Sequence, residues 1–178
     1  MFRKLKATEV ECRVSQVTAK GCSLLLYKNA RVDRSILDET VGPMNWQNDF
    51  KIIDGKMYGS ISIWDKDKEQ WITKFDCGTE SNTESEKGQA SDAFKRAGFK
   101  WGIGVELYTA PFIWASVPTK NIGTEDNEKW VLVNRYQKFL VDNIEYNDKG
   151  EISYLLITDE KGNKIFSGRK QCPSSSKK

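Results

Sequence analysis

The chain has 178 residues, the size of one ordinary domain with a small addition, and 38% of them are hydrophobic. Its 28 basic and 25 acidic residues give a formal net charge of +3, too small a surplus to identify a nucleic-acid-binding protein by composition. No apolar run approaches the roughly 18 to 20 residues that span a bilayer, so the sequence predicts a cytoplasmic protein without a membrane partner.

Several residue types on which enzymes and metal sites depend are missing. There is no histidine, which excludes the commonest general base and every Ser-His triad. No GxxxxGK[ST] run is present to bind the phosphates of ATP. The four cysteines, at positions 12, 22, 77 and 172, form no CxxC pair, so neither a structural zinc nor a disulfide framework is expected. These absences do not exclude an enzyme, but they remove most of the usual catalytic groups, and we expect no catalytic residues, no metal and no cofactor.

The first two thirds of the chain contain strand and helix signals in turn. Asn29 is predicted to cap a helix that ends at Gly42 and Pro43. Charged residues at 65–70 separate two segments with residue-by-residue alternation, which is typical of a hairpin. The predicted elements are two strands (10–18 and 22–27), a helix (29–43), a short strand (51–54), a hairpin (57–64 and 71–78) and a helix (87–101).

The remaining third has the pattern of β structure. Residues 116–129 are predicted as a linker or a long exposed loop, and NDKG and DEKG turns separate three strand-like segments after it. Because hairpins rather than crossover helices link the strands, we expect an α+β fold, an antiparallel sheet with packed helices and a small C-terminal β extension. The predicted organisation is a core (1–115), the linker (116–129), a small β-rich extension (130–168) and a disordered tail (169–178).

The helix at 87–101 has an apolar stripe and a basic side. On the basic side Lys95 and Arg96 flank Phe99, and Lys100 lies one turn beyond Arg96. In one interpretation these cations form a solvated face, with Asp92 paired to Arg96 at i,i+4. In the other they hold the phosphates of a nucleic acid, while Phe99 stacks on a base or packs against a neighbouring subunit or the C-terminal segment. The apolar stripe, which is suited to packing against a sheet, consists of Ala90, Ala93, Phe94, Ala97 and Trp101.

A family resemblance bears on this choice. Residues 87–108 read KGQASDAFKRAGFKWGIGVELY, and this run resembles the signature helix of the Sak-type phage single-strand annealing proteins of the Rad fifty-two superfamily. The segments before this helix also occur in the family's order: first the run ARVDRSILDETVGPMNWQ, then a hairpin that contains YGSISI. The resemblance covers roughly residues 10–114. The segment at 130–178 does not map onto the eukaryotic protein and looks like an extension found among the phage relatives.

The resemblance implies a β-β-β-α core that assembles into a ring or a helical filament, with single-stranded DNA in a basic groove. The family's Lys-Arg pair falls on Lys95 and Arg96, and an arginine of its first strand aligns with Arg13. One departure is that Phe99 and Lys100 stand where the eukaryotic helix has a further arginine. Alternation alone places Arg13 and Lys74, the two cations on predicted strands, on solvent-facing sides of those strands. The expected DNA-binding residues are Lys95, Arg96, Arg13, Lys100, Lys74 and Lys87.

The resemblance also implies a function. The family is non-enzymatic and ATP-independent, in agreement with the missing phosphate-binding loop. We therefore expect a single-stranded DNA-binding and annealing protein of phage or prophage homologous recombination and DNA repair, acting in the cytoplasm of a bacterial host. A host single-strand-binding protein is a candidate partner. Three alternatives stay open: a passive single-stranded DNA-binding protein, an assembly protein that binds no DNA, and a nuclease.

Overall fold

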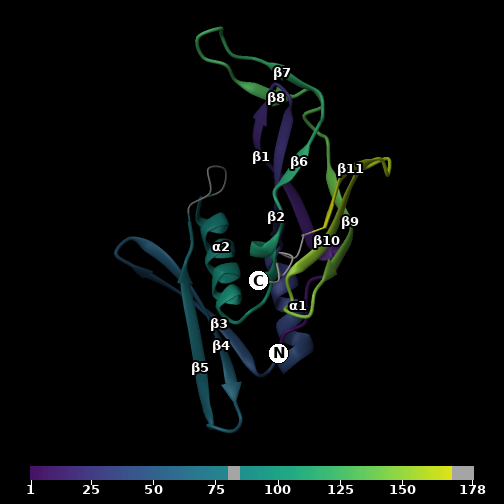
Figure 1. Ribbon diagram of the computed structural model, residues 1–178. Coiled ribbons are helices and arrows are strands. Elements are labelled where there is room, and N and C mark those ends of the chain that lie inside the picture. The colour runs from purple at the N-terminus through teal and green to yellow at the C-terminus, as the bar shows by residue number, and fades with distance from the viewer. Residues whose placement is uncertain (80–84, 170–178) are drawn as a thin grey trace, which may run out of the picture. The chain divides into compact units, whose positions relative to one another are not determined.

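The structure is a computed structural model that describes residues 1–79 and 85–169, with the side chains of 85–87 outside the description. The described residues form a mixed α+β fold of mostly antiparallel strands with two α-helices (Figure 1), which confirms the predicted class. Within these ranges no helix is both long and apolar enough to cross a bilayer. The chain divides into two compact units, residues 1–4 with 28–105, and residues 5–27 with the chain from Glu106 onward.

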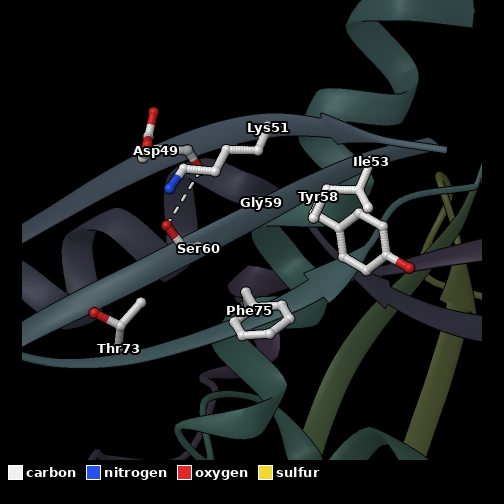
Figure 2. Close-up of a pocket in the computed structure, with 8 residues that line it drawn as sticks. All are labelled: Asp49, Lys51, Ile53, Tyr58, Gly59, Ser60, Thr73 and Phe75. Carbon is white, nitrogen blue, oxygen red and sulfur yellow. Dashed lines mark hydrogen bonds between the residues drawn. The ribbon is translucent and has the colours of Figure 1, made fainter. Parts of the chain in front are cut away.

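The first unit is built on a three-stranded antiparallel sheet with the order β3-β4-β5. Its strands are β3 (Trp46–Ile53), β4 (Lys56–Asp65) and β5 (Gln70–Cys77), and they pair without a register shift. Across the middle of the sheet, Ser60 of β4 lies opposite Asp49 of β3 and Phe75 of β5 (Figure 2). The predicted hairpin is confirmed, and the short strand predicted at 51–54 begins earlier, at Trp46.

Helix α1 (Ala30–Val41) begins and ends as its sequence predicts. The side chain of Asn29 accepts a hydrogen bond from the backbone N–H of Arg31 at 3.0 Å, which satisfies one of the free donors of the first turn. Gly42 follows the helix with φ of 84°, a conformation that favours glycine, and its N–H donates to the carbonyl oxygen of Asp38 at 3.0 Å. Both predicted ends of the helix are therefore confirmed.

Helix α2 (Ser85–Lys100) packs over β4 and β5. Small residues allow the close approach, since a Cβ added to Gly59 of β4 would lie 3.0 Å from the Cβ of Ala93. Beyond the end of α2, the indole Nε1 of Trp101 donates to the carbonyl oxygen of Ile61 at 2.9 Å. Ala93, Phe94 and Ala97 are buried, which confirms the apolar stripe as the side that faces the sheet.

The second unit is a six-stranded sheet that is nearly closed into a barrel. Its edge strands β11 and β6 approach each other, and aliphatic side chains such as Leu24, Leu155 and Ile157 are buried. The strand order is β11 (Lys164–Arg169), β10 (Ile152–Asp159), β9 (Phe139–Tyr146), β1 (Val10–Thr18), β2 (Gly21–Lys28) and β6 (Ile113–Ala115). Smaller elements are η1 (Ala7–Glu9), η2 (Val105–Thr109), β7 (Thr119–Asn121) and β8 (Trp130–Leu132).

Strands β9, β10 and β11 form the antiparallel meander that the sequence predicts. They continue the sheet of the N-terminal strands, because β9 pairs with β1 with Glu11 opposite Leu140. This pairing satisfies backbone groups that the edge of β1 would otherwise leave open. The two units therefore differ from the predicted division at 115/116, and the predicted linker contains β7. Arg169 ends β11, and the rest of the predicted tail lies outside the described residues.

Buried polar contacts join the start of the second unit to its later elements. The carboxylate of Glu106 is 1% exposed and accepts a hydrogen bond from the backbone N–H of Leu5 at 2.8 Å. The hydroxyl of Tyr146 donates to the carbonyl oxygen of Leu5 at 2.8 Å. Burial, together with the nearby negative charge of Glu106, raises the pKa of Tyr146 above its ordinary value. The phenol therefore stays a donor at every physiological pH.

Two leucines on neighbouring strands test this description of the second unit. Leu155 of β10 is 0% exposed, whereas Leu140 of β9 is 47% exposed. We expect Leu155→Ala to lower the free energy of unfolding by about 2–5 kcal/mol, because it leaves a cavity in the core. Leu140→Ala removes the same atoms from the surface and is expected to stay within about 0.5 kcal/mol of the parent. Urea denaturation measures both, and equal losses would contradict the assigned core.

Candidate nucleic-acid interface

Five of the six predicted DNA-binding residues belong to the first unit, and the structure describes the side chains of four of them. Arg13 belongs to β1 of the second unit, and the side chain of Lys87 lies outside the described residues. Those four are Lys95, Arg96 and Lys100 on α2 and Lys74 on β5.

Asp76 of β5 is shared by two cations of α2. Its Oδ1 lies 3.5 Å from Nη2 of Arg96, and its Oδ2 lies 3.8 Å from Nζ of Lys100. Lys74 donates from Nζ to the carbonyl oxygen of Lys100 at 2.9 Å, and the same Nζ lies 4.4 Å from the ring centroid of Trp101. We name Lys74, Asp76, Arg96 and Lys100 the Asp76 cluster.

The Asp76 cluster has an excess of positive charge. The cluster holds three cations and one carboxylate, which pairs with two of them, Arg96 and Lys100, at distances that are long for contacts of this kind. The side chains of Arg96 and Lys100 remain 41% and 51% exposed. Nε of Arg96 is itself buried and has no hydrogen-bond partner in the described part of the chain. The cluster can therefore accept a further anion, and the planar guanidinium of arginine is well suited to a phosphate.

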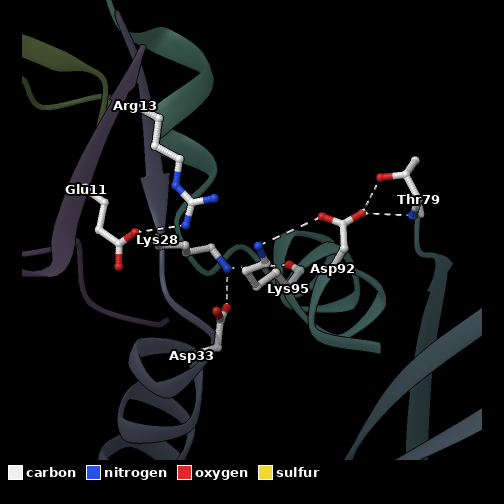
Figure 3. Close-up of polar contacts among 7 residues, drawn as sticks. All are labelled: Glu11, Arg13, Lys28, Asp33, Thr79, Asp92 and Lys95. Carbon is white, nitrogen blue, oxygen red and sulfur yellow. Dashed lines mark hydrogen bonds and ion pairs between the residues drawn. The ribbon is translucent and has the colours of Figure 1, made fainter. Parts of the chain in front are cut away.

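Lys95 lies beside Asp92 (Figure 3), a different carboxylate from the one that its neighbour Arg96 contacts. Its Nζ lies 4.0 Å from Oδ1 of Asp92, and its side chain is only 18% exposed. Asp92 also accepts hydrogen bonds from the backbone N–H and the hydroxyl of Thr79, each at 3.0 Å. The predicted pair between Asp92 and Arg96 is therefore wrong. Arg96 points toward β5 and pairs with Asp76, which leaves Asp92 to Lys95.

A buried ion pair lies next to these cations (Figure 3). Nζ of Lys28, at the end of β2, donates a hydrogen bond to Oδ1 of Asp33 on α1, and the two side chains are 1% and 0% exposed. The same ammonium lies 3.4 Å from the carbonyl oxygen of Lys95. Oδ2 of Asp33 has no hydrogen-bond partner among the described residues. The pair therefore connects α1 to the middle of α2 through one ammonium group.

Glycine and an aromatic ring complete the surroundings of this pair. A Cβ added to Gly98 would lie 2.5 Å from Oδ1 of Asp33, so only glycine leaves room for the carboxylate there. The ring centroid of Phe99 lies 4.3 Å from Nζ of Lys28, which is a cation–π contact. Phe99 thus has a partner within the first unit that none of its predicted uses anticipates, whether base stacking or packing against another subunit or the C-terminal segment.

Asp33 is the main residue beside these cations that the sequence did not reveal. Burial raises the pKa of its carboxyl to about 6, and the charges of Lys28 and Lys95 offset only part of that effect. A signal was present, because Asp33 precedes Ile36 and Leu37 by three and four residues and so shares their face of α1. A charged residue on the buried face of a helix calls for a buried partner.

Arg13 has its own surroundings in the second unit. Its side chain is 59% exposed, and Nη2 lies 3.0 Å from Oε2 of Glu11. The guanidinium carbon lies 5.0 Å from the ring centroid of Tyr27. An exposed arginine with one exposed carboxylate partner is available to an anion, since such surface pairs are weak.

Comparisons with protein families, curated proteins and solved structures found no match to this chain.

The buried carboxyl of Asp33 predicts a specific pH dependence of stability. Its pKa is raised from 3.8 to about 6 on folding, so the folded state binds this proton more tightly than the unfolded state. The resulting stabilisation is complete below pH 4 and is lost as the pH rises through 6. We compare the unfolding free energies of the parent and of an Asp33→Asn variant. The difference, parent minus variant, should fall by roughly 2–3 kcal/mol between pH 4 and pH 7. Denaturant titrations across this range measure the difference, and a flat profile would contradict the assignment.

Proposed function

We propose that this protein binds single-stranded DNA and anneals complementary strands without ATP, in homologous recombination and repair of a phage or prophage. The observation that carries the proposal is the Asp76 cluster, in which two cations of the helix that bears the family resemblance share one carboxylate of β5, and Lys74 adds a third cation beside them. The bacterial cytoplasm is the proposed location, and a host single-strand-binding protein is a proposed partner.

Phosphate neutralisation is the proposed source of affinity. Each phosphate that a lysine or arginine neutralises releases condensed counterions, which favours binding regardless of base sequence. Arg96 and Lys100 are the exposed cations of the cluster, and we assign them the main backbone contacts. Lys95 completes the Lys-Arg pair that the resemblance implies, but its ammonium must first leave Asp92 to reach a phosphate. Arg13 is the proposed contact from the second unit.

Annealing requires a strand that is held but remains able to pair. Contacts to the phosphates leave base edges free, so a second strand can test complementarity along the bound one. Base pairing then supplies the free energy, and no nucleotide hydrolysis is needed. We propose that copies of the chain assemble into a ring or filament, because repeating a weak site along one strand multiplies its affinity.

The salt dependence of binding tests the phosphate contacts. We expect the double variant Arg96→Ala with Lys100→Ala to bind an oligothymidylate more weakly than the parent. The slope of log K against log salt should become shallower by about 1.4, because each single-strand phosphate that the protein neutralises accounts for about 0.7 of the slope. Fluorescence anisotropy at several salt concentrations gives both quantities.

A matched control removes the same charge elsewhere. Lys149 and Lys161 are exposed lysines in the turns on either side of β10. The variant with both changed to alanine should keep the parent slope. An unchanged slope in the Arg96 and Lys100 variant would remove the Asp76 cluster from the site.

The rate of strand pairing separates annealing from passive binding. We expect the protein to accelerate pairing of two complementary oligonucleotides in the absence of ATP. Quenching of a fluorophore on one strand by a group on the other measures the rate. A passive single-strand binder would slow the same reaction, because it competes with the second strand. A protein that serves only assembly would leave the rate unchanged and would show no salt-dependent affinity for oligothymidylate. Light scattering on the same sample reports the size of the assembly.

A further inference from the structure

The three-stranded sheet of the first unit has one face under α2 and one open face. Gly59 of β4 points toward α2, since a Cβ there would meet Ala93. Side chains alternate along a strand, so Ser60 points to the opposite face, together with Asp49 and Phe75, which lie directly across from it. We name this side the open face. Phe75 is 57% exposed on it, unusually high for an aromatic ring in the middle of a strand.

The open face contains a cavity of about 320 Å³ (Figure 2). One wall is aromatic, because the rings of Tyr58 and Phe75 meet edge to face with centroids 6.2 Å apart. The rest of the lining includes hydrogen-bonding groups of both kinds: the carboxylate of Asp49, the ammonium of Lys51 and the hydroxyl of Thr73. An apolar wall with a few convergent polar groups is the usual composition of a small-ligand site.

The position of Phe75 relates this cavity to the Asp76 cluster. Phe75 stands between Lys74 and Asp76 in β5, so its side chain leaves one face of the strand while theirs leave the other. In its sheet, β5 is an edge strand. A chain molecule that follows this edge can therefore contact the cations on one side and the aromatic ring on the other, with only one strand between them.

We propose that the open-face cavity binds one base of the single strand whose phosphates contact the Asp76 cluster, with the base stacked on Phe75. This inference rests on the proposed function and adds to it a base contact beside the phosphate contacts. Two observations favour a nucleobase. The volume lies at the small end of the range for ligand pockets, about 300–1,000 Å³, which suits a single planar group. The adjacent surplus of positive charge is complementary to the phosphate that such a base carries.

A stacked base would set the spacing of the strand on each copy of the protein. Stacking on an aromatic ring tolerates every base, since each has a π-face, so this site adds affinity without sequence preference. Donors and acceptors in the lining, from Lys51 and Asp49, can satisfy the edge of any base. The nucleotides between two such sites stay free to pair.

The test compares two phenylalanines of the same sheet. Phe75→Ala should weaken binding of an oligothymidylate of about 20 nucleotides by about 5- to 150-fold, which corresponds to one base that no longer stacks. The slope of log K against log salt should not change, because no phosphate contact is removed. Phe50→Ala is the control: Phe50 is 40% exposed on β3 and lies opposite Gly59, on the side of the sheet that bears α2. It should bind as the parent does, and Phe75→Trp should restore the affinity that Phe75→Ala lacks.

A second probe isolates the base. An abasic oligodeoxyribose phosphate of the same length keeps the phosphates, so the parent and Phe75→Ala should bind it equally. The inference is overturned if Phe75→Ala binds oligothymidylate as tightly as the parent does. It is also overturned if weaker binding by Phe75→Ala comes with a smaller assembly in light scattering. The proposed function fails separately, if the parent binds oligothymidylate but does not accelerate the pairing of complementary strands. If the parent itself does not bind oligothymidylate, both are overturned.

Discussion

The buried ion pair between Lys28 and Asp33 is the constraint on which the first unit depends. Desolvating two charges costs more than their attraction returns unless neighbouring groups complete the contacts, and losing one partner of such a pair typically costs about 3–5 kcal/mol. Lys28 meets this requirement with Asp33, with the carbonyl oxygen of Lys95 and with the ring of Phe99. These three groups lie on α1 and α2, so one ammonium fixes the two helices against each other. The raised pKa of Asp33 indicates that desolvation still outweighs the attraction there.

The same constraint decides what each cation of α2 can do. Consecutive residues of a helix point about 100° apart, so anchoring α2 through the backbone of Lys95 turns the side chains of Lys95 and Arg96 to different neighbours. Lys95 lies beside Asp92 and the buried pair, with little exposure. Arg96 lies beside β5, where Asp76 and Lys100 are within reach. The Lys-Arg pair of the sequence is therefore two distinct sites in the fold. Of these two residues, only Arg96 belongs to the Asp76 cluster.

Local chemistry made much of the fold predictable. The cap at Asn29, the stop at Gly42 and the alternation on both sides of the loop at 65–70 depend on neighbouring residues, and each is found as predicted. The pairing of Glu11 with Leu140 joins residues far apart in the chain, and no local pattern encodes such a partner. The candidate site was likewise predictable only in its local part. Helical periodicity gave the basic side of α2, but the counter-ion of Arg96 comes from another element. A carboxylate supplied by a neighbouring strand cannot be read from spacing within the helix.

Strand β5 is where these constraints meet. Alternation sends Lys74 and Asp76 to the side of α2 and Phe75 to the open face, so one edge strand presents charge on one side and an aromatic ring on the other. The ion pairs of Asp76, at 3.5 and 3.8 Å, are too long to be strong hydrogen bonds, and both of its partners are partly in water. A phosphate can therefore replace the carboxylate at small cost and be released again. That reversibility would suit the proposed annealing, because a protein that held each phosphate tightly would keep the strand after it had paired. Weak contacts repeated along the proposed assembly would retain a single strand and still release a duplex, whose paired bases could no longer stack on a protein ring.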